Sequence, residues 1–247
     1  MRILILTWIA AFIISGCAFA PPLPQIESKR GDRFGILVNI GDYPVHKHIG
    51  FPPFEKKYPY PWNLNAEISR RMAETVRNAG FIPIDLSSEG VAIGDVSGLI
   101  QPVDTAWRLE PGKATIWHRL HHELNLRAII TIKDSHTLID SICQKYSCTY
   151  IFADAPGLYS FKFFWTIYKA MMPFDWNVYV LNPIANTAKA DPLLFYLNAN
   201  RTASINGFNG PADIDQLTEA EFAPVKEAIL QSTASATMEA VKTLNTK

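Results

Sequence analysis

The stretch LHHELNLRAIITIKD, residues 120–134, carries the clearest information about the fold. Residues 126–133 form a short apolar run rich in β-branched side chains, which predicts a buried strand. The preceding residues, 113–124 (KATIWHRLHHEL), predict a helix. A helix that leads directly into a buried strand is typical of α/β proteins, in which helices cover a sheet.

The chain before this unit follows the same pattern. Residues 33–40 (RFGILVNI) predict a buried strand, and residues 81–86 (FIPIDL) predict a second strand, which Pro83 places at a sheet edge. Between them, apolar residues recur every three to four positions over residues 66–80, which predicts a helix that begins near Asn63 and ends at Gly80. These elements give a strand, helix, strand start.

The chain after this unit predicts further strands at residues 149–154, 176–183 and 193–201, with residues 184–191 (IANTAKAD) as the turn of an antiparallel hairpin. Thr218 and Glu221 form a capping-box pattern before a long helix over residues 220–244. We therefore expect an α/β fold with a mixed β-sheet covered by helices, a late antiparallel hairpin and a long C-terminal helix.

The N-terminus has the parts of a secretory signal: Arg2, twelve apolar residues and a small-residue patch. The apolar run is too short to span a bilayer, which takes about 20 residues. One cleavage site would follow Ala20, but a proline comes next. The other reading uses residues 14–17 (ISGC), which resemble the lipobox of bacterial lipoproteins, with Cys17 as the lipidated first residue.

The lipobox resemblance implies attachment to a membrane without a spanning segment, because acyl chains anchor a protein from one side. Ala18 follows the cysteine where the family's inner-membrane retention signal would be Asp, which favours the outer membrane over the cell membrane. In either location the anchored protein is expected to face the periplasm. We expect residues 1–16 to be a signal peptide, 17–32 the lipidated N-terminus and a flexible tether, and 33–247 a single α/β domain.

Composition narrows the possible partners. Removal of the signal peptide takes away one basic residue and leaves 22 basic and 23 acidic side chains, a formal charge of −1. A near-neutral surface gives no reason to expect nucleic-acid binding. The 48% hydrophobic and 12% aromatic content favours a folded protein over a disordered one.

Cys143 and Cys148 are separated by four residues in SICQKYSCTYIF. In an oxidising periplasm, two nearby thiols in a turn are expected to pair. We predict a disulfide that closes a short loop; two unpaired core cysteines are the alternative.

The order of elements, the lipobox, the unit at residues 120–133 and the segment NVYVLNPIANTAKADPLLFY (177–196) together resemble the curli-secretion lipoprotein and the lipoprotein activators of penicillin-binding proteins. The resemblance is one of pattern and covers about 150 residues. The long aromatic segment after the first strand has no counterpart in these families. The resemblance therefore implies a fold more than a role.

The main candidate residues for catalysis or metal binding follow the first strand, where α/β proteins place binding loops. Asp42, His46 and His48 could ligate a metal or perform acid–base work, and the alternative is that they are solvated loop residues. His118 and His122 share a helix face but lack the glutamate of a metalloprotease motif. No glycine-rich motif supports a nucleotide, so we expect no cofactor.

Two other short patterns have competing interpretations. Residues 134–136 (DSH) contain the three residue types of a hydrolase's catalytic triad, although residues adjacent in sequence rarely form such a triad. The aromatic segment 161–176, FKFFWTIYKAMMPFDW, suits either the core or a membrane interface.

Residues 41–63 predict a long loop, which in a compact domain usually binds something or is disordered. The aromatic residues of this segment could form a docking surface, since the prolines among them lower the entropy lost on binding. The alternative is a lid whose aromatic rings cover the domain's own core. The candidate partner-binding residues are Phe51, Phe54, Tyr58, Tyr60 and Trp62.

From these observations we expect a non-catalytic, lipid-anchored cell-envelope protein that binds an envelope partner. A cell-envelope hydrolase or a metal-binding protein using the loop after the first strand is the alternative.

Overall fold

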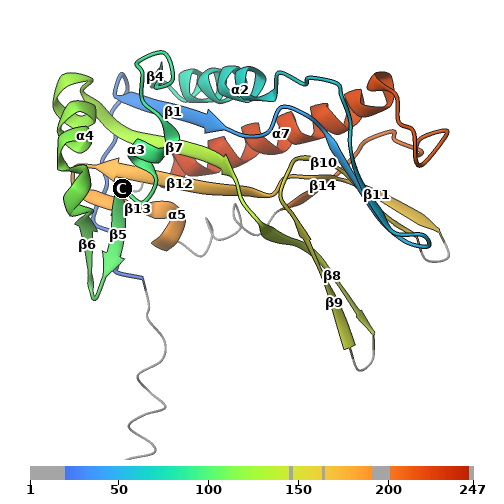
Figure 1. Cartoon of the computed structure of the whole chain (residues 1–247). Coiled ribbons are helices and arrows are strands. Elements are labelled where there is room, and N and C mark those ends of the chain that lie inside the picture. The colour runs from blue at the N-terminus through green and yellow to red at the C-terminus, as the bar shows by residue number, and fades with distance from the viewer. Residues whose placement is uncertain (1–19, 145–146, 163–164, 191–200, 245–247) are drawn as a thin grey trace, which may run out of the picture.

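A computed structural model describes residues 20–144, 147–162, 165–190 and 201–244 (Figure 1). Its central sheet has the strand order β13-β12-β7-β1-β4. The sheet is mixed, because β1 runs parallel to β4 and β7 whereas β12 runs antiparallel to β7 and β13. The predicted α/β fold is confirmed, and β4 lies at the edge as Pro83 indicated. The strands are β1 (Arg33–Asn39), β4 (Ile82–Asp85), β7 (Leu126–Asp134), β12 (Phe174–Leu181) and β13 (Ile184–Asn186).

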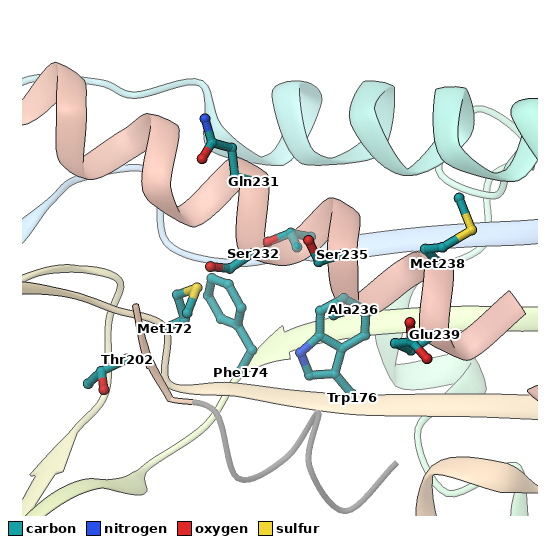
Figure 2. Close-up of a pocket in the computed structure, with 11 residues that line it drawn as sticks. Met172, Phe174, Trp176, Thr202, Gln231, Ser232, Ser235, Ala236, Met238 and Glu239 are labelled. Atoms are coloured by element: carbon teal, nitrogen blue, oxygen red, sulfur yellow. The ribbon is translucent and has the colours of Figure 1, made fainter. Parts of the chain in front are cut away.

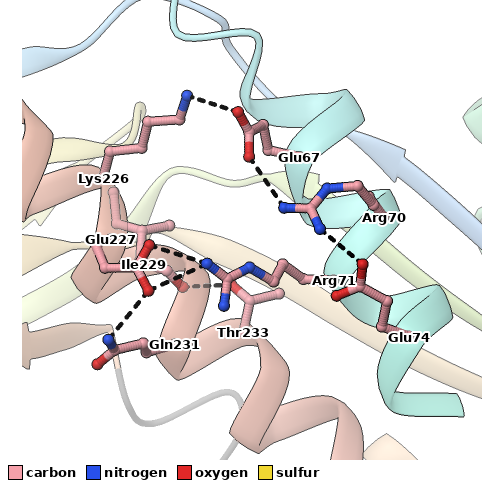
Figure 3. A network of polar contacts seen from close by, with 9 residues as sticks. All are labelled: Glu67, Arg70, Arg71, Glu74, Lys226, Glu227, Ile229, Gln231 and Thr233. Carbon is pink, nitrogen blue, oxygen red and sulfur yellow. Dashed lines mark hydrogen bonds and ion pairs between the residues drawn. The ribbon is translucent and has the colours of Figure 1, made fainter. Parts of the chain in front are cut away.

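Two long helices, α2 (Leu64–Asn78) and α7 (Glu219–Thr243), lie side by side on one face of this sheet (Figure 1). The apolar stripe of α2 is buried at every fourth residue, from Leu64 to Val76. Ion pairs join the two helices across their exposed sides, Arg71 with Glu227 and Lys226 with Glu67, each at 3.1 Å (Figure 3). The long C-terminal helix begins at the predicted capping box, where the Thr218 hydroxyl accepts a hydrogen bond from the backbone N–H of Glu221.

The late hairpin differs from the prediction. Asn182 and Pro183 form the turn between β12 and β13. Residues 184–190 therefore supply β13 and the short helix α5 (Thr187–Ala190) and are not a turn. The predicted strand at 193–201 lies outside the described residues except for Arg201.

A second five-stranded sheet, with the order β14-β11-β10-β2-β3, was not predicted. The prediction of a long loop at residues 41–63 is wrong, because this segment contains the hairpin of β2 and β3. β2 lacks the alternating apolar residues that predict a strand, because its inward-facing side chains are those of His46 and His48. The strands are β2 (Val45–Ile49), β3 (Phe54–Lys57), β10 (Gly157–Lys162), β11 (Thr166–Met171) and β14 (Thr202–Ser204).

Two separate hairpins lie at opposite ends of β7 (Figure 1). The hairpin of β5 (Ile100–Val103) and β6 (Ala106–Leu109) lies near the start of β7. The chain enters this hairpin from the short helix α3 (Ile93–Val96). It continues to β7 through η2 (Pro111–Lys113), α4 (Ala114–His118) and the π-helical turn η3 (Arg119–Glu123). The hairpin of β8 (Thr137–Gln144) and β9 (Ser147–Ala153) follows the end of β7. The predicted disulfide is confirmed: Cys143 and Cys148 face each other across this hairpin and are bonded.

Residues 20–32 are not the free tether expected from the sequence. Ile26 is buried in the core, and the indole of Trp107 on β6 donates a hydrogen bond to the carbonyl of Pro22 at 3.2 Å. Gly31 donates its backbone N–H to the carbonyl of Gly80. None of the helices in the described ranges is long and apolar enough to cross a membrane.

Candidate functional site

The predicted docking aromatics lie in different environments. Tyr58 and Trp62 are 3% and 4% exposed, with their rings 4.9 and 5.5 Å from the ring of Phe222 on α7. Tyr60 is half-buried and stacks on Tyr58. These three side chains cover the domain's own core, as the alternative reading has it, so their part in a docking surface is not supported.

The other two docking candidates lie on the hairpin of β2 and β3. Phe54 is half-buried against the imidazole rings of His46 and His48, at 5.0 and 5.1 Å between ring centres. Phe51, at the turn, is 97% exposed. Of the five predicted residues, Phe51 is thus the one whose whole side chain is available to a partner.

His46 and His48 meet Ser160 in the second sheet. The Ser160 Oγ lies 2.6 Å from His46 Nε2 and 2.7 Å from His48 Nδ1, because β10 places Ser160 beside His48 in parallel register with β2. All three side chains are buried, with Ser160 and His46 at 0% exposed. Burial, followed by the charge of His48, lowers the pKa of His46 to about 4; burial also lowers the pKa of His48.

This arrangement has the spacing of a nucleophile and its base. A serine hydroxyl held between two neutral imidazoles can donate to one nitrogen and accept from the other. A substrate, however, cannot reach Ser160 Oγ while the side chain is completely buried. In this conformation the cluster is a buried polar contact that joins β2 to β10.

Asp42 is not part of that cluster. Its Oδ1 accepts a hydrogen bond from the backbone N–H of Leu64 at 2.8 Å, so it serves the start of α2. Asn63, near which the helix was expected to begin, has a left-handed backbone and makes no side-chain cap bond. Among the described residues, no group of three or more His, Cys, Asp or Glu side chains is placed to hold a metal ion.

The residues of the DSH pattern are also separated. Asp134 accepts a hydrogen bond from the backbone N–H of Gly41, and burial raises the pKa of Asp134 to about 6. His136 instead pairs with Asp154 on the exposed surface. Asp134 and His136 therefore have different partners and do not form a charge relay.

The hairpin of β8 and β9 has apolar side chains on both faces. Its inner face packs Ile139, Ile151 and Ala153 against the second sheet. Its outer hairpin face consists of Leu138, Tyr150 and Phe152, which are 41%, 62% and 43% exposed. The sequence signal for this surface is the runs of consecutive apolar residues at 138–139 and 150–152. Neighbouring residues in a strand point to opposite faces, so such runs place apolar side chains on both faces.

A cavity of about 630 Å³ lies between α7 and β12 (Figure 2). The rings of Phe174 and Trp176 point from β12 toward α7, where the small residues Ser232, Ser235 and Ala236 leave the space open. This part of the aromatic segment 161–176 belongs to the interior, whereas Trp165 is 69% exposed. The cavity has room for an apolar group but few charged atoms to orient a ligand.

No protein-family model matches the chain, and no curated protein matches it significantly.

Proposed function

We propose that this chain is a lipid-anchored, non-catalytic cell-envelope protein that binds an envelope partner through the outer hairpin face. The observation that carries the proposal is the exposure of Leu138, Tyr150 and Phe152 on one face of a two-stranded sheet. Contiguous exposed apolar side chains on a folded protein often mark an interaction site.

The chemistry of the hairpin indicates the kind of partner. Within the part of the chain that the structure describes, each strand of this two-stranded sheet has one edge without a neighbouring strand, and such an edge can accept an added strand. The disulfide between Cys143 and Cys148 holds the two strands together at the far end. The partner is therefore an extended segment of another protein that brings apolar side chains onto the outer hairpin face.

The anchor is the acylated Cys17. The five residues from Cys17 to Pro22 span at most about 18 Å, so the docking of Pro22 on Trp107 would keep the membrane near the hairpin of β5 and β6. The hairpin of β8 and β9, which carries the outer hairpin face, lies at the other end of β7 (Figure 1). This arrangement would leave the docking surface free to face the periplasm, and the disulfide suits that oxidising compartment.

The anchor is tested by growth with a labelled palmitate analogue. The wild-type chain should incorporate the label and Cys17→Ser should not. Equal labelling of the two proteins would show that the chain is not anchored through Cys17.

The docking surface is tested by capture from cross-linked envelopes. Tyr150→Glu places a charge on the outer hairpin face and should abolish capture of a partner. Ile82→Glu is the matched control, because Ile82 is 47% exposed on β4, at an edge of the central sheet. Loss of the partner with both variants, or with neither, would contradict docking at this face.

The hydrolase alternative has one specific observation in its favour, the contact of Ser160 with two histidines. It requires an opening that exposes Ser160 Oγ. A fluorophosphonate probe tests it: our proposal expects no labelling of Ser160, and labelling that disappears in Ser160→Ala would favour the hydrolase.

A further inference from the structure

A polar cavity of about 380 Å³ lies on the face of the central sheet opposite to α7. Asp175, Asn177 and Tyr179 of β12 line it, whereas the alternating residues Phe174 and Trp176 point toward α7 (Figure 2). The opposite wall includes Gly98, whose backbone N–H donates a hydrogen bond to the Tyr179 hydroxyl at 3.0 Å. The central sheet therefore forms one wall of the cavity, and residues 97–102 form the opposite wall.

Two ammonium groups share one carboxylate in this cavity. Lys133 Nζ lies 3.8 Å from one oxygen of Asp175, and Lys189 Nζ lies 3.5 Å from the other. Both distances exceed the usual 2.7–3.2 Å of a hydrogen bond, so this carboxylate does not saturate the ammonium protons. Among the described residues that line the cavity, the charged side chains are two lysines and one aspartate, a net charge of +1.

Buried amides hold Asp175 in position. Asn186, 2% exposed, donates from Nδ2 to the Oδ1 of Asn177 at 3.1 Å. Asn177, 6% exposed, donates in turn to Asp175 at 3.4 Å. Buried amides cost free energy unless they are hydrogen-bonded, and apolar side chains would fill a purely structural position more easily. This chain of amides orients the carboxylate that keeps both lysines at the cavity.

We propose that this cavity binds a small molecule through a phosphate or carboxylate group held between the ammonium groups of Lys133 and Lys189. An ammonium is a compact charge that suits either oxyanion. The volume lies at the lower end of the range of about 300–1,000 Å³ for small-molecule sites, and a few polar groups in fixed positions are typical of such sites. This proposal is independent of the anchor and of the outer hairpin face.

Thermal unfolding of the purified full chain tests the site, with sodium phosphate or sodium acetate titrated against sodium chloride at constant ionic strength. A ligand that binds the folded state raises the unfolding midpoint in a saturable way. We expect such a rise with at least one of the two oxyanions, and the stronger response identifies the class. Lys133→Gln and Lys189→Gln should each weaken the apparent affinity by about tenfold or more, because each removes a charged hydrogen-bond donor.

Lys242→Gln is the matched control, since it removes the same charge from an exposed ion pair at the end of α7. It should respond to the oxyanions like the wild type. A rise of equal size in all four proteins would mean non-specific ion effects and would overturn the proposal. The absence of a saturable rise with either oxyanion in the wild type would overturn it as well.

Discussion

Trp62→Ala is the substitution that best separates packing from docking in the segment 41–63. Trp62 is 4% exposed, and its ring meets the completely buried ring of Phe222 edge to face at 5.5 Å. Truncation of a buried aromatic side chain to alanine costs about 3–5 kcal/mol, and an edge-to-face pair contributes about 0.5–1.5 kcal/mol of that. We therefore expect Trp62→Ala to lower the free energy of unfolding by about 4 kcal/mol.

The assay is urea unfolding of the full chain, followed by far-UV circular dichroism so that loss of a tryptophan does not change the signal. With an m value of about 2–3 kcal/mol/M, the midpoint should fall by roughly 1–2 M. Phe51→Ala, in the same segment and 97% exposed, is the control and should change the free energy of unfolding by less than about 0.5 kcal/mol.

The opposite pattern would refute the reasoning. If Trp62→Ala left the urea midpoint unchanged and abolished capture of an envelope partner, the aromatic ring would be part of a docking surface and not of the core. A double substitution with Phe222→Ala adds a second check, because contacting residues should show a coupling energy of about 0.5–1.5 kcal/mol.

Three further predictions concern buried polar groups and the disulfide. Because burial lowers the pKa of His46 to about 4 from about 6.5, the unfolded chain takes up a proton first as pH falls through this window. Between pH 7 and pH 4, the free energy of unfolding of the wild type, measured by urea titration, should therefore fall by on the order of 3 kcal/mol more than that of His46→Gln. Equal pH dependence of the two free energies would contradict this. Asp134 affects the pH dependence of stability in the opposite direction, because its raised pKa of about 6 means that its charged form destabilises the folded state. Asp134→Asn should therefore raise the free energy of unfolding by on the order of 2 kcal/mol at pH 7 and have no effect below about pH 4. Replacement of Cys143 and Cys148 by serine should cost about 2 kcal/mol or less because the closed loop is short, and alkylation of the exported wild type without reductant should add no label in intact-mass analysis.

The elements that the sequence predicted are those with a clear apolar period. β7 and β1 are apolar on both faces because helices or loops cover both, and α2 has its stripe from Leu64 to Val76. The second sheet escaped prediction because His46 and His48 fill inward positions of β2, where a period-two pattern requires apolar residues. Their burial depends on Ser160, more than 110 residues later in the chain.

The candidate site could be predicted only in part for a similar reason. Whether Tyr58 and Trp62 cover the core or face a partner is decided by Phe222, which no local pattern connects to them. The segment around Cys143 and Cys148 predicted the disulfide correctly, and residues 149–154 predicted the strand that is β9 (Ser147–Ala153). The strand before the disulfide, β8 (Thr137–Gln144), was missed. The outer hairpin face follows once those strands are known.

Site-specific photo-cross-linking tests the central claim most directly. A photo-reactive amino acid replaces Tyr150 on the outer hairpin face, and in a second protein it replaces Ile82 on β4, which is similarly apolar and exposed. After illumination of intact cells, the probe at position 150 should form one discrete adduct with an envelope protein, and the probe at position 82 should not. The absence of an adduct at position 150, or the same adduct from both positions, would contradict docking through the outer hairpin face.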